Sequence, residues 1–108
     1  MSTPILYSKR GGAQVGSVHG SWPFGKIEIS NSSVTVRVLG KSRTLTEAEV
    51  LRVESLGFFA SAEGGPGVRI FFRAEHWEEF VDFHSLSAHR EILEVLKQAG
   101  FNVVERDK

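Results

Sequence analysis

The sequence contains no cysteine and no long apolar run. Without cysteine the chain forms no disulfide and has no thiolate to act as nucleophile or metal ligand. No apolar stretch approaches the roughly 20 residues that a membrane-spanning helix needs. The N-terminus lacks a basic segment followed by an apolar run, so we expect no signal peptide. The missing signal peptide and membrane span predict a cytoplasmic protein, whereas the missing cysteine by itself does not indicate the redox compartment. A chain of 108 residues is long enough to bury a single core.

An excess of charge of one sign is also missing. The chain has 13 basic and 13 acidic residues and an isoelectric point near 6.9. Nucleic-acid-binding domains more often have an isoelectric point above about 9, so we expect no nucleic-acid partner. The balance hides an asymmetry, since residues 1–46 carry a net charge of +5 and residues 47–108 carry −5. It favours an anionic partner, unless the two halves interleave in the fold and their fields cancel, which is the outcome we expect for a small domain.

Catalytic and metal-binding patterns are missing as well. No serine lies in a G-x-S-x-G turn, and the glycines of residues 11–16 are not followed by the Lys-Ser/Thr of a phosphate-binding loop. His76, Asp82, His84 and His89 lie close in sequence but without regular ligand spacing. A three-ligand site of Asp82, His84 and His89 is the alternative. We expect no enzymatic activity, no metal and no cofactor.

Alternating residues predict strands in the middle of the chain. Residues 26–30 and 34–39 alternate strictly around a short polar turn, and pairing Ile29 with Val34 sets Ile27 against Val36 on one apolar face. Further strands are expected at 43–45, 50–56 and 80–84. Residues 1–21 are rich in glycine and predict a flexible arm or an edge strand, which leaves residues 22–108 as the domain.

The hairpin from Phe58 to Arg73 is the expected centre of the fold. Its loop contains three glycines and Pro66, and its register is predicted to place Phe59 opposite Phe71. The inward face is then wholly apolar, with Val68, Ile70 and Phe72 on the second strand. The outward face carries the aromatic pair, flanked by Arg69 and Arg73.

One amphipathic helix follows the strands. Residues 88–99 place apolar side chains on one face, Ser87 is the expected N-cap, and Gly100 suits the left-handed position after the helix. Phe101 is then expected to contact Leu96, as in a Schellman ending. The predicted class is α+β: a strongly bent antiparallel sheet of six to seven strands, capped by one C-terminal amphipathic helix.

This arrangement resembles the small bacterial relatives of the pleckstrin-homology (PH) superfold, including GRAM-like domains. The resemblance rests on Trp22-Pro23, on the strand Gly67–Ile70, and on Leu93 and Leu96 leading into the segment 99–101. It covers residues 22–101 and implies a PH-like barrel. It also implies a non-catalytic module that binds lipid headgroups, peptides or other subunits.

The headgroup pattern of that superfold places a lysine at the end of the first strand and a basic-x-basic triplet on the second. Lys26 matches the first position, whereas Arg37 is not followed by a second cation, and Lys41 and Arg43 lie a turn later. These four residues are the candidates for an anionic ligand. Because they depart from the pattern, a lipid-headgroup binder is the alternative function and not the first.

The first function expected from the sequence is protein binding or self-association through Phe59, Phe71, Arg69 and Arg73. Two large rings on an outward face need a cover, and the candidates are residues 5–7 or a second copy of the chain. We favour the second copy, because a symmetric homodimer needs only one self-complementary patch.

Overall fold

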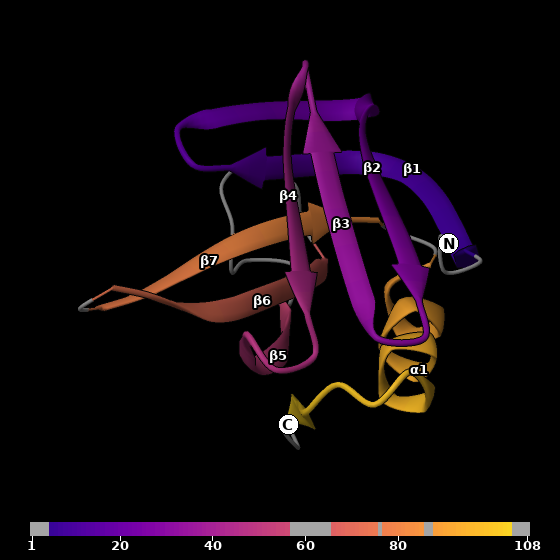
Figure 1. Cartoon of the computed structure of the whole chain (residues 1–108). Helices are drawn as coiled ribbons and strands as arrows, with labels where there is room; N and C mark the ends of the chain where they lie inside the picture. The colour runs from indigo at the N-terminus through magenta and orange to yellow at the C-terminus, as the bar shows by residue number, and fades with distance from the viewer. Residues whose placement is uncertain (1–4, 57–65, 76, 86–87, 105–108) are drawn as a thin grey trace.

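The computed structural model describes residues 5–56, 66–75, 77–85 and 88–104. These ranges contain eight strands and one helix, so the α+β class is confirmed and the strand number is corrected from six or seven to eight (Figure 1). The elements are β1 (Ile5–Val15), β2 (Val18–Ser30), β3 (Ser33–Val38), β4 (Lys41–Thr46), β5 (Val50–Leu56), β6 (Gly67–Ala74), β7 (Trp77–His84), α1 (His89–Gln98) and β8 (Val103–Val104).

All eight strands belong to one sheet with the order β4-β3-β2-β1-β7-β6-β5-β8. Neighbouring strands are antiparallel except β5 and β8, which are parallel. The order is linear, so the sheet is open, with β4 and β8 at its two edges. Figure 1 shows β4 crossing in front of β6 and β7, with β3 and β2 beside β4 and α1 beside the lower ends of β2 and β3.

The N-terminal segment is an inner part of the sheet. The expectation that residues 1–21 form a flexible arm or an edge strand is therefore wrong for residues 5–21, the part that the structure describes. Strand β1 pairs with β2 on one side and with β7 on the other. Glycines permit this close approach: a Cβ on Gly11 of β1 would collide with the carbonyl oxygen of His84 in β7, and one on Gly25 of β2 would lie 2.7 Å from the carbonyl carbon of Gly12 in β1. The glycines therefore serve strand crossing and not flexibility.

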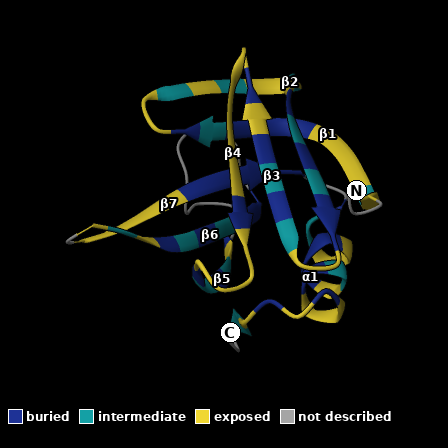
Figure 2. Ribbon diagram, viewed as in Figure 1, coloured by how far each residue is buried: buried dark blue, intermediate teal, exposed yellow. Residues whose placement is uncertain are grey.

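The predicted first hairpin is confirmed in its register. Ile29 lies opposite Val34 and Ile27 opposite Val36, and all four side chains are buried. Figure 2 shows the resulting alternation of buried and less buried bands along β3. The period-2 pattern worked here because one face of each strand is covered and the other is not.

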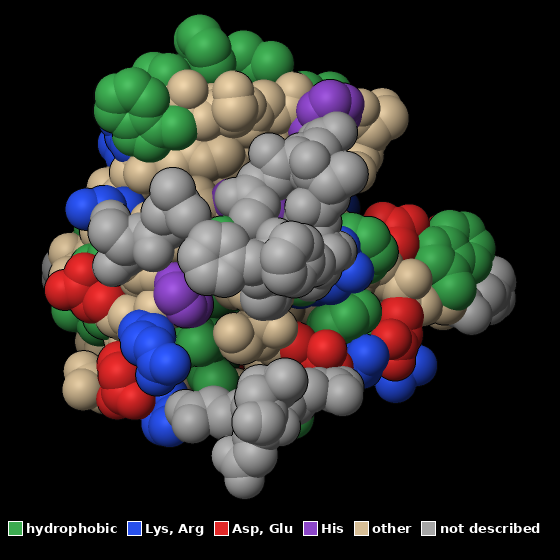
Figure 3. All heavy atoms as spheres, turned by 180° about the vertical axis from the view of Figure 1, so that it is seen from behind, with side chains coloured by type: hydrophobic (Ala, Val, Ile, Leu, Met, Phe, Trp, Pro, Cys, Tyr) green, Lys and Arg blue, Asp and Glu red, His purple; other side chains and the backbone are tan. Residues whose placement is uncertain are grey.

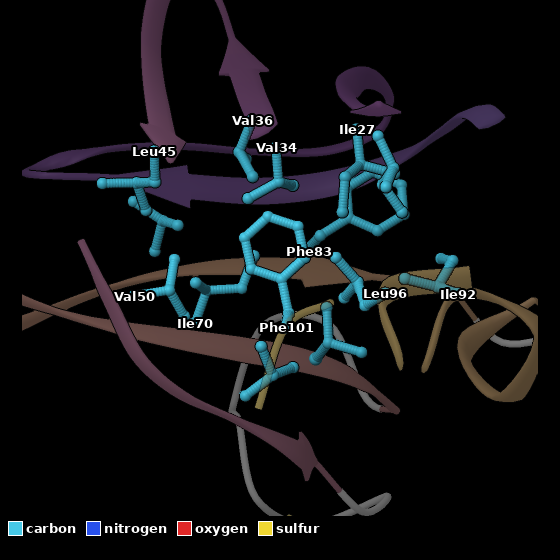
Figure 4. Packing of buried hydrophobic residues seen from close by; sticks show 14 of the residues in the cluster. Ile27, Val34, Val36, Leu45, Val50, Ile70, Phe83, Ile92, Leu96 and Phe101 are labelled. Carbon is cyan, nitrogen blue, oxygen red and sulfur yellow. The ribbon is translucent and has the colours of Figure 1, made fainter. Parts of the chain in front are cut away.

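The core lies between the β2–β4 part of the sheet and the β5–β7 part. Phe83 of β7 is 0% exposed. Its ring reaches β1, since a Cβ on Gly11 would lie 2.7 Å from its Cζ atom. Figure 4 shows Val34 and Val36 of β3 on one side of the core, and Ile70 of β6 and Leu96 of α1 on the other. The predicted inward face of β6 is confirmed, because Val68, Ile70 and Phe72 are all buried.

The helix ends as the sequence predicts. Gly100 has a φ of 101°, the amide of Phe101 donates to the carbonyl of Leu96 at 3.0 Å, and the amide of Gly100 donates to the carbonyl of Lys97 at 3.1 Å. These two bonds form a Schellman motif. The N-cap is Ala88 and not the expected Ser87, which lies outside the described residues. The amide of Ala88 donates to the hydroxyl oxygen of Ser85 at 3.0 Å.

A hydrogen bond from β1 ties the helix to the sheet. The Tyr7 hydroxyl donates to Glu91 at 2.9 Å, and burial together with this carboxylate raises the pKa of Tyr7 to about 12. Because the folded state favours the protonated phenol, its contribution to stability is present below pH 10 and is lost between about pH 10 and 12. Residues 5–7 pair along β2 and do not cover Phe71, as the intramolecular cover would require.

The hairpin expected from Phe58 to Arg73 differs in its strand pairing. Phe58 and Phe59 lie outside the described residues, and β6 pairs with β5 on one side and β7 on the other. The residues opposite Phe71 are Arg52 and Phe80. The expected pairing of Phe59 with Phe71 is therefore wrong, since both cross-strand positions are taken by other strands.

Candidate functional site

Alternating rings and arginines occupy the outward face of β5, β6 and β7. The Phe71 and Phe80 rings meet edge to face with their centroids 5.9 Å apart. The Arg52 guanidinium lies 3.9 Å from the centroid of Phe71, and the Arg69 guanidinium lies 3.9 Å from that of Phe80. Each ring thus has a cation from its own chain over it.

Acidic side chains hold these arginines in place. Asp82, whose side chain is 2% exposed, accepts two hydrogen bonds from Arg69 at 2.8 and 2.9 Å. Arg52 donates to Glu54 at 2.8 Å and to Glu78 at 3.3 Å. The bond to Asp82 raises the pKa of Arg69, and the bonds to Glu54 and Glu78 raise that of Arg52. Both arginines therefore form ion pairs within the chain.

The structure brings together part of the predicted interface. Arg69, Phe71 and Arg73 share the outward face of β6, and Arg73 lies at its exposed end opposite Glu78. Phe59 lies outside the described residues. Because Arg52 and Arg69 cover the rings of Phe71 and Phe80, this face needs an external cover less than the sequence suggests. Phe80 nevertheless keeps 39% of its surface exposed.

The four anionic-ligand candidates do not converge. Lys26 and Arg37 lie opposite each other on the outward face of β2 and β3, and both contact Glu28 at 3.4 Å. Lys41 lies opposite Val38 and Arg43 opposite Val36, so these two belong to the other face of the sheet. A single headgroup pocket built from all four, as the sequence hypothesis supposes, is thus not formed.

Arg43 has a structural role in this arrangement. Its guanidinium lies 4.4 Å from the centroid of the Phe72 ring, at the open seam where the edge strand β4 passes over β6. Phe72 is only 3% exposed. Arg43 therefore covers the core at a place where the sheet does not close.

We expect Arg43→Ala to lower the free energy of unfolding by about 1 kcal/mol, through lost cation–π attraction and exposure of Phe72. Chemical denaturation measures this. Arg37→Ala on the outward face is the control, with an expected change below about 0.5 kcal/mol. Equal losses for the two variants would contradict a role for Arg43 at the seam.

A third basic residue extends the outward pair. Arg10 of β1 lies opposite Lys26, which in turn lies opposite Arg37, so three cations form one row across β1, β2 and β3. Like charges directly opposite each other destabilise a sheet, and Glu28 contacts two of them, Lys26 and Arg37. The sequence analysis missed Arg10, because the pairing of β1 with β2 was not predicted.

Exposed apolar side chains gather beside this row. Trp22, Phe24 and Leu39 are 70%, 58% and 59% exposed. We call these three residues the apolar tip. Figure 3 shows hydrophobic side chains at the top of the molecule, the end at which β2 turns and the β3–β4 hairpin lies in Figure 1. Their glycine-flanked segment with an internal proline was the available sequence signal of a protrusion.

Charge is separated between the two parts of the sheet. Strands β1 to β4 are contiguous in the sheet order, and residues 5–46 hold six basic residues and one acidic residue. The expected interleaving of the two sequence halves is therefore wrong. The basic half of the chain forms one continuous part of the molecule, which also carries the apolar tip.

Within the described ranges no three His, Asp or Glu side chains are grouped as a metal site, and His76 of the sequence cluster lies outside these ranges. The helix that the structure describes is too short and too polar to cross a bilayer.

Comparison with known proteins gives the fold alone. No protein-family model matches the chain, and no curated protein matches its sequence. The chain is similar in structure to the C-terminal domain of an unknown protein from Leishmania infantum, with a TM-score of 0.66 and 10% sequence identity. The similarity covers 90% of this chain and 84% of that domain. At this identity it supports the α+β architecture and carries no function.

Proposed function

We propose that the chain is a non-enzymatic interaction module with a PH-like fold, and that it binds an anionic lipid surface through the part of the sheet formed by β1 to β4. The architecture supports the PH-like assignment: one bent, open sheet folds around a core, and the helix α1 lies at one end of it. The proposed PH-like fold includes the resemblance to GRAM-like domains.

The observation that carries the proposal is the charge of the β1–β4 part. Six basic residues against one acidic residue lie on contiguous strands, and the row of Arg10, Lys26 and Arg37 sets like charges side by side. Such a row opposes folding, whereas an anionic surface would be attracted to it. Each basic side chain near an anionic membrane contributes about 1 kcal/mol to binding.

The binding is expected to be diffuse and not specific for one headgroup. Lys26 and Arg37 share Glu28, and Arg43 lies over Phe72. A phosphate pocket needs several converging donors, and these four candidates diverge over two faces. The affinity for anionic membranes is therefore set by the positive surface potential of β1 to β4 and not by a specific headgroup pocket.

Co-sedimentation with vesicles tests this proposal. The chain is expected to bind vesicles of phosphatidylcholine with phosphatidylserine, not vesicles of phosphatidylcholine alone, and binding should weaken as salt shortens the Debye length from about 30 Å at 0.01 M to about 8 Å at 0.15 M. Arg10→Glu with Arg37→Glu should abolish it. Arg73→Glu with Arg90→Glu, in the acidic half, is the matched control. No binding at low salt would overturn the proposal.

Self-association through the outward face of β5 to β7 is the second candidate. Phe80 and Trp77 keep 39% and 55% of their surfaces exposed beside the arginine-covered rings. Sedimentation equilibrium over a range of concentrations measures it, with Phe80→Ser as the disrupting variant. A monomeric mass at every concentration would exclude the homodimer.

A further inference from the structure

We propose that the apolar tip of Trp22, Phe24 and Leu39 inserts into the interface of an anionic bilayer and sets the orientation in which the module binds. This inference rests on the proposed function and names the residues that make the contact. The residues that make the contact belong to a protrusion of the sheet, and they are not the basic residues that the sequence suggested for headgroup binding.

The tip is built by a large bulge in β2. Gly11 lies opposite Gly25 and Ala13 opposite Gly20, so the single residue Gly12 spans the whole segment 21–24 of the partner strand. The extra residues leave the ladder and project from it. A Cβ on Gly12 would lie 3.2 Å from the carbonyl oxygen of Gly20, which leaves little room for β1 to fill the bulge from below.

Leu39 joins the bulge from the neighbouring hairpin. A Cβ on Gly20 would lie 3.3 Å from Leu39 Cδ1 and 3.4 Å from Phe24 Cβ, so both side chains border the same glycine. Leu39 has a φ of 48°, a backbone conformation that favours glycine or asparagine. The stability of the fold therefore gives no reason for a leucine at position 39, or for its exposure to solvent.

The charge around the tip selects an anionic occupant. Lys26 follows Phe24 by two residues in β2, a rise of about 7 Å along the strand, and Lys41 follows Leu39 by two residues across the turn between β3 and β4. A symmetric contact between two tips would bring two such basic parts together, and the like charges would repel. An anionic surface would instead attract these lysines.

The shape and composition of the tip select a bilayer. Trp and Phe are favoured at the boundary between headgroups and acyl chains, where an apolar ring is covered while neighbouring lysines reach phosphates. The tip is a projection of three large side chains and not a groove into which a partner helix or strand would fit. Membrane insertion covers it without a complementary protein surface.

The two tryptophans of the chain allow a direct test. Trp77→Phe leaves Trp22 as the only tryptophan, and Trp22→Phe leaves Trp77, which is 55% exposed on the β6–β7 hairpin at another side of the molecule. Equimolar phosphatidylcholine and phosphatidylserine vesicles carrying a brominated acyl chain are added to each. Trp22 fluorescence is expected to shift to shorter wavelength and to be quenched, whereas Trp77 fluorescence stays unchanged.

Substitutions measure the contribution of the tip. Trp22→Ser with Phe24→Ser should lower vesicle affinity on the order of tenfold or more, with an unchanged melting temperature because both side chains are exposed. Trp77→Ser is the matched control and should bind as the parent does. The expected loss should persist at a salt concentration at which charge substitutions have little effect.

Three results would overturn the inference. Vesicle binding without quenching of Trp22 would leave the proposed function standing and exclude insertion of the tip. A parent chain whose mass falls to that of a monomer on Trp22→Ser with Phe24→Ser would assign the tip to a second copy. Absence of binding to the anionic vesicles at low salt would remove the proposed function and the inference together.

Discussion

Phe83→Ala is expected to lower the free energy of unfolding by about 3–5 kcal/mol. The ring is 0% exposed and reaches from β7 to β1, where a Cβ on Gly11 would lie 2.7 Å from its Cζ atom. Alanine would leave a cavity that strands from both sides cannot fill without breaking their ladders. Chemical denaturation followed by circular dichroism measures the loss, which is a large fraction of the net stability of a small domain.

Phe80→Ala on the same strand is the control for Phe83→Ala. Its ring is 39% exposed and packs against Phe71 and Arg69, so we expect a loss of about 1 kcal/mol. A larger effect for Phe80 than for Phe83 would mean that the outward face, and not the interior, holds β7 in place.

Arg69→Ala is expected to cost about 3 kcal/mol. It removes both hydrogen bonds to Asp82 and leaves a carboxylate whose side chain is 2% exposed without its cation. Removing one partner of a buried ion pair is costly because the remaining charge loses the interaction that offset its desolvation. The estimate is at the low end of the usual range because the Arg69 side chain is itself 27% exposed.

Two further variants interpret the Arg69 result. Arg73→Ala, on the same face of β6 but exposed, should change stability by less than about 0.5 kcal/mol. Asp82→Asn with Arg69→Met replaces both charges and should recover part of the loss, since no uncompensated carboxylate remains. If Arg69→Ala were as mild as Arg73→Ala, the pair with Asp82 would not contribute to stability.

Local patterns predicted the elements whose partners are near in sequence. The pairs of Ile27 with Val36 and of Ile29 with Val34 followed from strict alternation around a short turn. The Schellman ending at Gly100 followed from a glycine after an amphipathic helix. In both cases the information lies within a dozen residues, and tertiary contacts reinforce the local preference.

The pairing of β6 was predicted less well. Phe71 was assigned a partner from the adjacent stretch, but its neighbours come from β5 and from β7. Glycines in β1 were interpreted as flexibility, although a Cβ on Gly11 would collide with the carbonyl oxygen of His84 in β7. A glycine looks the same in sequence whether it permits motion or close approach, and only the neighbouring strand distinguishes the two.

The sequence by itself determined the α+β class, the inward apolar residues of β2, β3 and β6, and the end of the helix, because each depends on a local period or a local backbone conformation. Only the tertiary structure decided which cations lie together and which apolar side chains remain uncovered. Arg10 lies opposite Lys26 because β1 and β2 form a long hairpin, and the Arg43 guanidinium lies over the Phe72 ring. Trp22 is exposed because it lies in a bulge of β2. These outcomes depend on strand register and on the bend of the sheet, which join residues that no local pattern relates.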